Sequence, residues 1–75
     1  MEFEYEIKEK IATISVKGKN DDFAMELNVI SFNGNRPKYD LRNWKRSENL
    51  MLKGITMTAE ELQTLKDTLN EMDII

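Results

Sequence analysis

The chain has 75 residues, enough for one small domain with a modest core and a narrow margin of stability. It contains no Cys and no His, which excludes a disulfide framework and the usual zinc ligands. A net charge of −3 with 40% hydrophobic residues indicates a folded chain rather than a disordered one. Because so small a core has no covalent support, we expect a single domain over residues 1–75 that gains stability as a homodimer.

The N-terminus is charged and alternating, without the basic and then apolar pattern of a signal peptide. No apolar stretch approaches the roughly 20 residues of a membrane-spanning helix. We therefore expect a cytoplasmic location without membrane association.

Period-two alternation predicts two strands near the N-terminus. The first covers residues 2–8, where Phe3, Tyr5 and Ile7 alternate with charged side chains. The second covers residues 11–17, where the apolar positions have the opposite phase. A loop rich in Gly, Asn and Asp follows, and it is typical of a turn.

A third strand is predicted over residues 23–32, with Met25, Leu27 and Val29 on one face. Asn28 and Phe32 belong to its other face. The run Asn33-Gly34-Asn35 then predicts a hairpin turn, because Asn and Gly tolerate the positive φ of tight turns.

The fourth predicted strand, residues 38–44, carries the most informative pattern. Alternation directs Tyr39 and Leu41 to the core. The outer face receives two cations, a carboxylate and an indole, from Lys38, Asp40, Arg42 and Trp44.

Positive charge is concentrated around this strand. Residues 36–54 hold six Lys or Arg against two carboxylates, whereas the segments on either side are acidic. Local charge rather than net charge decides what docks on a surface. Cations interleaved with Tyr39 and Trp44 are what a single nucleic-acid strand requires, because phosphates need charge and bases need flat rings.

One helix is predicted over residues 59–72. Thr58 and Glu61 have the spacing of a capping box. Leu62, Leu65, Leu69 and Met72 form an apolar stripe, which would cover the sheet or pack on a dimer mate. The order β-β-β-β-α indicates an α+β fold.

A sheet covered by one helix keeps one face open. Alternation places four large apolar residues on faces that are otherwise polar: Ile11, Ile30, Phe32 and Trp44. Exposed there, they would meet a partner protein or stack on a ligand.

From Met25 onward the chain resembles the transcriptional positive-coactivator (p15-type) family of single-stranded-DNA-binding domains, in particular its short bacterial YdbC-like branch. The resemblance is carried by ELNVISFNGNRPKYDLRNW, residues 26–44, and by LKGITMTAEELQTLKDTL, residues 52–69. It implies a β-β-β-β-α protomer, a symmetric homodimer, and two curved sheets that grip single-stranded DNA without strong sequence preference.

The resemblance also implies roles for individual residues. Phe32 and Trp44 would stack on bases, and Gly54 would let the backbone approach the strand. Contacts to phosphates or base edges are implied for Arg36, Lys38, Arg42 and Lys53, and more loosely for Lys17 and Lys19 in the loop before the third strand. Asn28 and Lys45 complete the candidate interface.

The chain departs from the family pattern in three places. Phe32 stands where Trp is frequent, and Leu52 stands where Gly is common. The loop over residues 45–50 lacks the usual Asp-Pro start and is more basic.

Each signal has a structural alternative. Trp44 suits a dimer seam, Phe32 the core, and Arg42 an ion pair with Asp40 or Glu26. Arg36 and Lys38 could instead be solvated edge charges that discourage pairing between sheets. Lys53-Gly54 could be an ordinary turn. Lys45 and Arg46 could be loop charges without fixed contacts.

The sequence favours a single-stranded-DNA-binding protein that acts in transcription regulation or in replication and repair. A protein-interaction module that uses the same face for a polymerase subunit or an acidic partner is the alternative, as is binding of single-stranded RNA. Catalysis is not expected, because no imidazole or thiol is present to activate Ser15, Ser31 or Ser47. We expect no cofactor, metal or small-molecule substrate.

Overall fold

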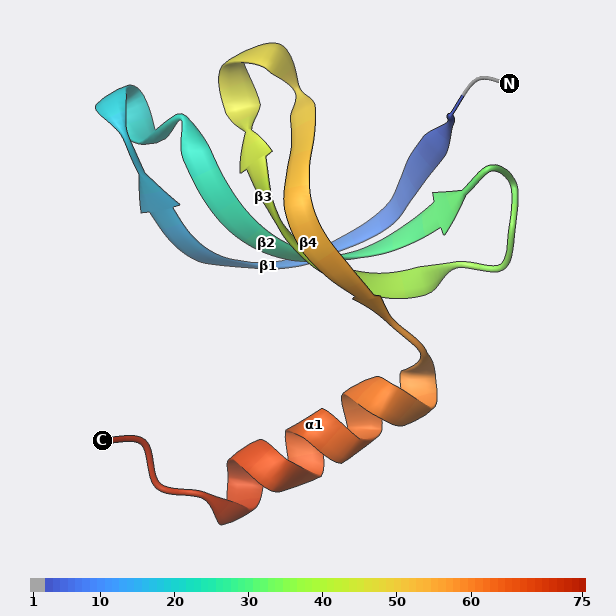
Figure 1. The fold of residues 1–75 in the computed structure, drawn as a ribbon, viewed down its shortest axis with the longest axis vertical. Coiled ribbons are helices and arrows are strands. Elements are labelled where there is room, and N and C mark those ends of the chain that lie inside the picture. Colours follow the sequence, from blue (N-terminus) through green and yellow to red (C-terminus); the bar gives the residue numbers. More distant parts are fainter. Residues whose placement is uncertain (1–2) are drawn as a thin grey trace.

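The computed structural model describes residues 3–75, and residues 1 and 2, where the first predicted strand begins, lie outside the described part. It is a four-stranded antiparallel sheet in the order β1-β2-β3-β4, followed by one C-terminal helix (Figure 1). The predicted α+β protomer is confirmed. The elements are β1 (Tyr5–Lys17), η1 (Lys19–Asp21), β2 (Phe23–Phe32), β3 (Lys38–Lys45), η2 (Arg46–Glu48), β4 (Leu50–Met57) and α1 (Ala59–Glu71), where η marks a 3₁₀ turn.

The two strands predicted at the N-terminus are one continuous strand, β1. Its register against β2 shifts at three places, the first of them between Ile7 and Glu9. A bulge inserts one extra residue into a strand and reverses the side-chain alternation beyond it. Two of these shifts lie between Ile7 and Ala12, so the alternation there returns to its original phase. Tyr5 and Ile7 therefore belong to the concave face, whereas Ile14 lies on the helix side of the sheet. The change of phase in the sequence reflects a change of the apolar face within one strand and not a strand break.

The fourth strand of the sheet, β4, was not predicted, and an ordinary turn was the structural alternative considered for Lys53-Gly54. Gly54 lies in the middle of β4, directly opposite Arg42 of β3. A Cβ atom there would overlap the Cβ of Arg42 and lie 2.6 Å from both its Cα and the Leu41 carbonyl oxygen. Gly54 therefore permits a close approach of two strands, a use of glycine that resembles a turn signal in the sequence.

The sheet is strongly curved, and α1 lies below its convex side (Figure 1). The best buried side chains belong to the concave face, where Ile30 is 0% and Trp44 only 4% exposed. The prediction that both would be exposed on an open face is wrong, because curvature folds that face onto itself. Ile11 is exposed as predicted, and Phe32 is half-buried.

The convex face is less well covered than predicted. Tyr39 and Leu41, assigned to the core, are only half-buried.

The capping box at the start of α1 is confirmed, because the Thr58 hydroxyl accepts from the Glu61 N–H and the Glu61 carboxylate accepts from the Thr58 N–H. No residue of α1 is fully buried, and the helix packs only sparsely on β3 and β4.

The predicted loops have the expected backbone. Gly18 has φ 82° between β1 and β2, and Gly34 has φ 75° between β2 and β3. Asn33 has φ 51°, and its N–H donates to the Glu4 carbonyl while its side chain accepts from the Glu4 N–H. This pairing fixes the β2–β3 turn against the start of the described chain.

No helix within residues 3–75 has the length and apolar character needed to cross a membrane.

We expect Gly54→Ala to lower the free energy of unfolding by about 3 kcal/mol, because the new methyl group meets backbone atoms that cannot rotate away. Urea denaturation followed by circular dichroism measures this loss. Gly34→Ala is the comparison, since no atom lies within 4 Å of its added Cβ and only the positive φ opposes it, at a cost of about 1 kcal/mol. An equal loss in the two variants would contradict the close approach.

Candidate nucleic-acid interface

One row of side chains from each strand lines the concave face. The strand register brings the predicted Asn28, Phe32, Lys38, Arg42 and Trp44 together there. The whole row consists of Tyr5, Ile7, Lys10, Thr13 and Val16 from β1, Ala24, Glu26, Asn28, Ile30 and Phe32 from β2, Lys38, Asp40, Arg42 and Trp44 from β3, and Met51, Gly54 and Thr56 from β4.

Arg42 is anchored at the centre of this face by a buried ion pair. Its Nε donates to Asp40 Oδ1 at 2.6 Å, and its Nη2 donates to Asp40 Oδ2 at 2.5 Å. Nη1 donates to the Leu52 carbonyl at 3.2 Å, and the Thr56 hydroxyl donates to Asp40. The Asp40 side chain is 0% exposed and that of Arg42 13%. The ion pair considered as the alternative for Arg42 is present, although it is buried rather than superficial, and it leaves two of the five guanidinium N–H groups available.

A chain of aromatic rings extends from Arg42 along the concave face. The Arg42 Cζ lies 5.7 Å from the Phe32 ring centroid, a distance suited to a cation–π contact. The Phe3 ring lies 5.9 Å from Phe32 and 6.3 Å from Tyr5. Tyr5 in turn lies 5.8 Å from Trp44. Phe32 and Phe3 retain exposed surface, so a base has rings to stack on at this end of the face.

Trp44 is buried in the floor of the concave face, and its ring presents almost no surface to solvent. It is 4% exposed, and the Tyr5 ring lies beside it. Its Nε1–H is buried and has no hydrogen-bond partner among residues 3–75. Stacking of a base on Trp44 stays a prediction, and it requires the Tyr5 side chain to move.

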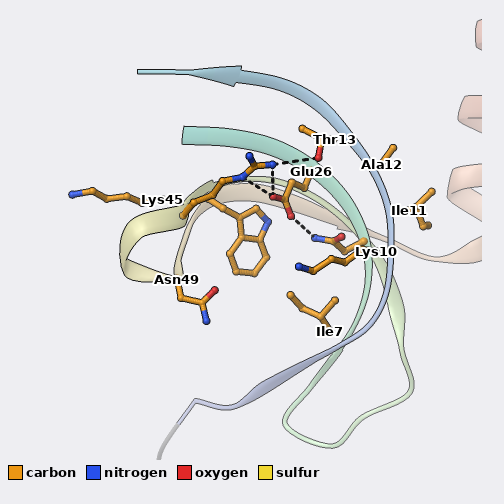
Figure 2. Close-up of a pocket in the computed structure, with 11 residues that line it drawn as sticks. Ile7, Lys10, Ile11, Ala12, Thr13, Glu26, Lys45 and Asn49 are labelled. Carbon is orange, nitrogen blue, oxygen red and sulfur yellow. Dashed lines mark hydrogen bonds and ion pairs between the residues drawn. The ribbon is translucent and has the colours of Figure 1, made fainter. Parts of the chain in front are cut away.

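A cavity of about 530 Å³ opens beside Trp44 (Figure 2). Ile7 lies inside the curve of the sheet and Lys10 near the centre of the view, whereas the Ile11 side chain lies on the outer side of β1. Glu26 faces the cavity from β2. The remaining lining residues are Ala12, Thr13, Asn28, Trp44, Lys45, Arg46 and Asn49.

Arg46 closes one side of this cavity. Its Nε and Nη2 donate to Glu26 Oε2, each at 3.4 Å, and Nη2 also donates to the Thr13 hydroxyl at 3.4 Å. These contacts connect η2 to β1 and β2 across the sheet. Arg46 was interpreted as a solvated loop charge, but it has fixed partners.

The two loops at this end of the sheet are joined through Asp22. The Asp22 carboxylate accepts from the Ser47 N–H and the Ser47 hydroxyl, and its carbonyl accepts from the Arg46 N–H. The junction gathers the loop cations at one end of the concave face, while Arg36 lies in the β2–β3 loop at the other end (Figure 1). These cations are Lys17, Lys19, Lys45 and Arg46.

Lys45 is paired with Glu48. The Glu48 carboxylate accepts a hydrogen bond from the Lys45 ammonium and attracts its charge, and both effects raise the pKa of Lys45 above its ordinary value. The pair favours the charged form of Lys45, and the Glu48 carboxylate already compensates part of that charge.

Lys53 lies in a bulge of β4. There Leu52 and Lys53 together face the single residue Asn43, and Leu52 turns its carbonyl to Arg42. The Lys53 side chain is exposed. Gly54 makes its close approach to Arg42, and its predicted contact with a DNA strand stays a prediction.

Several residues of the concave face were missed at the level of sequence, namely Tyr5, Lys10, Thr13 and Glu26. Three of them belong to β1, where the bulges change the phase of the alternation and hide which side chains share a face. Within residues 3–75, no three His, Cys, Asp or Glu side chains gather closely enough to hold a metal ion.

We expect Asp40→Asn to lower the free energy of unfolding by about 3 kcal/mol, because it leaves the Arg42 guanidinium partly buried without a counter-charge. Urea denaturation provides the measurement. Glu6→Gln is the matched control, since it removes a carboxylate from the exposed Lys8–Glu6 pair and is expected to cost less than about 1 kcal/mol. Similar losses in both variants would show that the Asp40–Arg42 pair adds nothing beyond a surface pair.

A family model and a relative from another organism match this chain. The family model described as Transcriptional Coactivator p15 (PC4) matches residues 19–68, which include β2, β3, β4 and most of α1. An uncharacterized protein of Treponema pallidum (strain Nichols) is 38% identical over 73 residues, covering 97% of this chain and 84% of that protein. The chain therefore belongs to the transcriptional coactivator p15 (PC4) family.

Proposed function

We propose that this chain binds single-stranded DNA along the concave face of its sheet, as a homodimer and with little sequence specificity. Membership of the PC4 family supports nucleic-acid binding and a coactivator-like function. Transcription regulation is the process that this membership favours, with DNA replication and repair as alternatives, and we place the protein in the cytoplasm. No catalytic step is proposed. The observation that carries the proposal is the concave row in which cations and aromatic rings lie side by side.

Phosphate binding is supported by cations that are not already neutralised. Arg36, Lys38 and Lys53 are exposed and form no ion pair with any other residue in the part of the chain that the structure describes. Such side chains release condensed counterions when they contact phosphates, which supplies affinity and makes it salt-dependent. The paired cations Lys45 and Arg46 would add charge only after exchanging a carboxylate for a phosphate.

Preference for single strands is supported by the rings. Phe32 is half-buried and Phe3 is 62% exposed, so both offer ring surface beside the Arg42 guanidinium. Stacking of a base on an aromatic ring contributes about 1–3 kcal/mol in single-strand binders. A duplex buries its base faces in its own stack and cannot use these rings.

Dimerisation is supported by the poorly covered convex side. A cavity of about 430 Å³ between α1 and the sheet is lined almost entirely by apolar side chains. Ile14, Ile55 and Leu69 are 57%, 56% and 49% exposed. So much exposed apolar surface marks an interaction site. A second copy of the chain would cover it and leave both concave faces free.

Fluorescence polarisation with labelled oligo-dT of about 20 nucleotides and a duplex of matched length tests binding. We expect tighter binding to the single strand and a steep loss of affinity as salt rises. Lys38→Ala should reduce the slope of log K against log salt by about 0.7, the value of one phosphate contact on a single strand.

Lys66→Ala is the control for this experiment, because Lys66 carries the same charge but lies on α1. Equal weak binding to oligo-dT and duplex would defeat the stacking part of the proposal. An unchanged slope in Lys38→Ala would remove Lys38 from the interface. A lower Kd for oligo-U than for oligo-dT would assign the site to RNA.

For the dimer, we expect Leu69→Glu to convert the protein to a monomer, because it places a charge on the apolar stripe of α1. Sedimentation equilibrium measures the mass directly. Thr64→Glu adds the same charge on the opposite side of the helix and should leave the dimer intact. A wild-type protein that sediments as a monomer would reject the dimer without affecting the DNA-binding proposal.

A further inference from the structure

The carboxylate of Glu26 is enclosed but loosely held. Its side chain is only 15% exposed and lines the cavity of the concave face. Every hydrogen bond that it accepts, two from Arg46 and one from Asn28, is 3.4 Å long. Asp40, by comparison, accepts from Arg42 at 2.5 and 2.6 Å. Charge-assisted bonds are normally 2.7–2.9 Å, so the Glu26 oxygens have room for a better partner.

A second polar group in the same cavity wall lacks a hydrogen-bond partner in the part of the chain that the structure describes. This group is the buried Nε1–H of Trp44, a residue that lines the cavity. An unsatisfied buried donor is costly, and an acceptor oxygen seated in the cavity relieves that cost. The cavity therefore combines an acceptor-only carboxylate with a donor-only indole.

We propose that this cavity holds one guanine base of the bound single strand, with Glu26 as the residue that recognises it. The inference rests on the proposed single-strand binding. Glu26 accepts from the N1–H and the 2-amino group of guanine, one oxygen for each. The guanine O6 accepts from the Trp44 Nε1–H, after a small adjustment of the side chains around it.

The four bases differ in their ability to match these groups. Guanine offers two adjacent donors beside a carbonyl acceptor, so it engages both carboxylate oxygens and the indole. Adenine has an amino group but no carbonyl, and cytosine presents one amino donor next to an acceptor ring nitrogen that the carboxylate repels. Thymine presents a single N–H between two carbonyls. A site built on paired hydrogen bonds discriminates strongly against partners that leave them unmade.

The rest of the cavity suits a nucleotide. Its volume of about 530 Å³ is within the range of small-molecule sites, and Ile7 offers an apolar side chain on which a base can pack. Seating the base requires Arg46 to release Glu26 (Figure 2). The freed guanidinium then has a phosphate of the same strand as its new partner, so the ion pair is exchanged rather than lost.

The test compares oligo-dT strands that carry one central substitution. By fluorescence polarisation, we expect a strand with central dG to bind about tenfold tighter than the dT strand. Central deoxyinosine, which keeps N1–H and O6 but lacks the 2-amino group, should have an intermediate Kd. Central dA and dC should resemble dT.

Glu26→Gln should remove the difference between dG and deoxyinosine, because an amide has one acceptor oxygen where the carboxylate has two. The affinity of the same variant for plain oligo-dT is the reference for both strands. Glu9→Gln removes the same charge from an exposed residue of β1 outside the cavity, and it should retain the preference for dG. Thermal unfolding checks that both variants are folded. If Glu26→Gln does not fold, the affinities of the wild-type protein for the dG, deoxyinosine and dT strands decide whether the cavity recognises guanine.

A spectroscopic readout reports on the indole. The chain has one Trp, so its indole N–H gives a single cross-peak in a ¹H–¹⁵N correlation NMR spectrum. This cross-peak should shift more on addition of the dG strand than on addition of the dT strand. Equal affinity for dG and dT strands, or a preference for another base, overturns the inference but leaves the proposed function standing. If none of the strands binds, both are overturned.

Discussion

The buried pair of Asp40 and Arg42 holds the concave face in its shape. It pins β3 to β4, because Arg42 also donates to the Leu52 carbonyl and Thr56 donates to Asp40. The strands can approach closely there only because Gly54 has no side chain. Removing two charges from water is expensive, so the pair stabilises the fold only while all its hydrogen bonds are made. The Phe32 ring rests against the same guanidinium, and one network thus fixes both a cation and a ring.

The two faces of the sheet divide burial in an unusual way. The concave face encloses polar side chains, Asn28 and Asp40 among them, together with Trp44. The convex face and α1 keep apolar side chains such as Ile14, Ile55 and Leu69 accessible. Curvature explains the first feature, since bending a sheet brings the side chains of its inner face together. The second feature leaves apolar surface exposed, and burying such surface against another protein lowers the free energy. In the proposed function the two sides therefore have different tasks.

Some cations near the concave face are already paired with carboxylates, and others are not. Lys45 is paired with Glu48 and Arg46 with Glu26, whereas Arg36 and Lys38 have no acidic partner in the described chain. The free cations attract a phosphate backbone from a distance, and the paired ones respond only at contact. Acidic residues elsewhere in the chain outnumber these cations and give the molecule its net charge of −3.

The sequence alone determined the α+β class, the strands over residues 23–32 and 38–44, the Asn33-Gly34 turn and the capping box of α1, because each depends on neighbours in the chain. It also determined that Phe32, Lys38, Arg42 and Trp44 share a face, since period two operates within and between paired strands. Only the tertiary structure decided that β1 is continuous, that Gly54 lies within β4 and that Trp44 is buried. Bulges, a close approach of two strands and the curvature of the sheet cause these features. All three depend on contacts between residues far apart in the chain, and no local pattern encodes them.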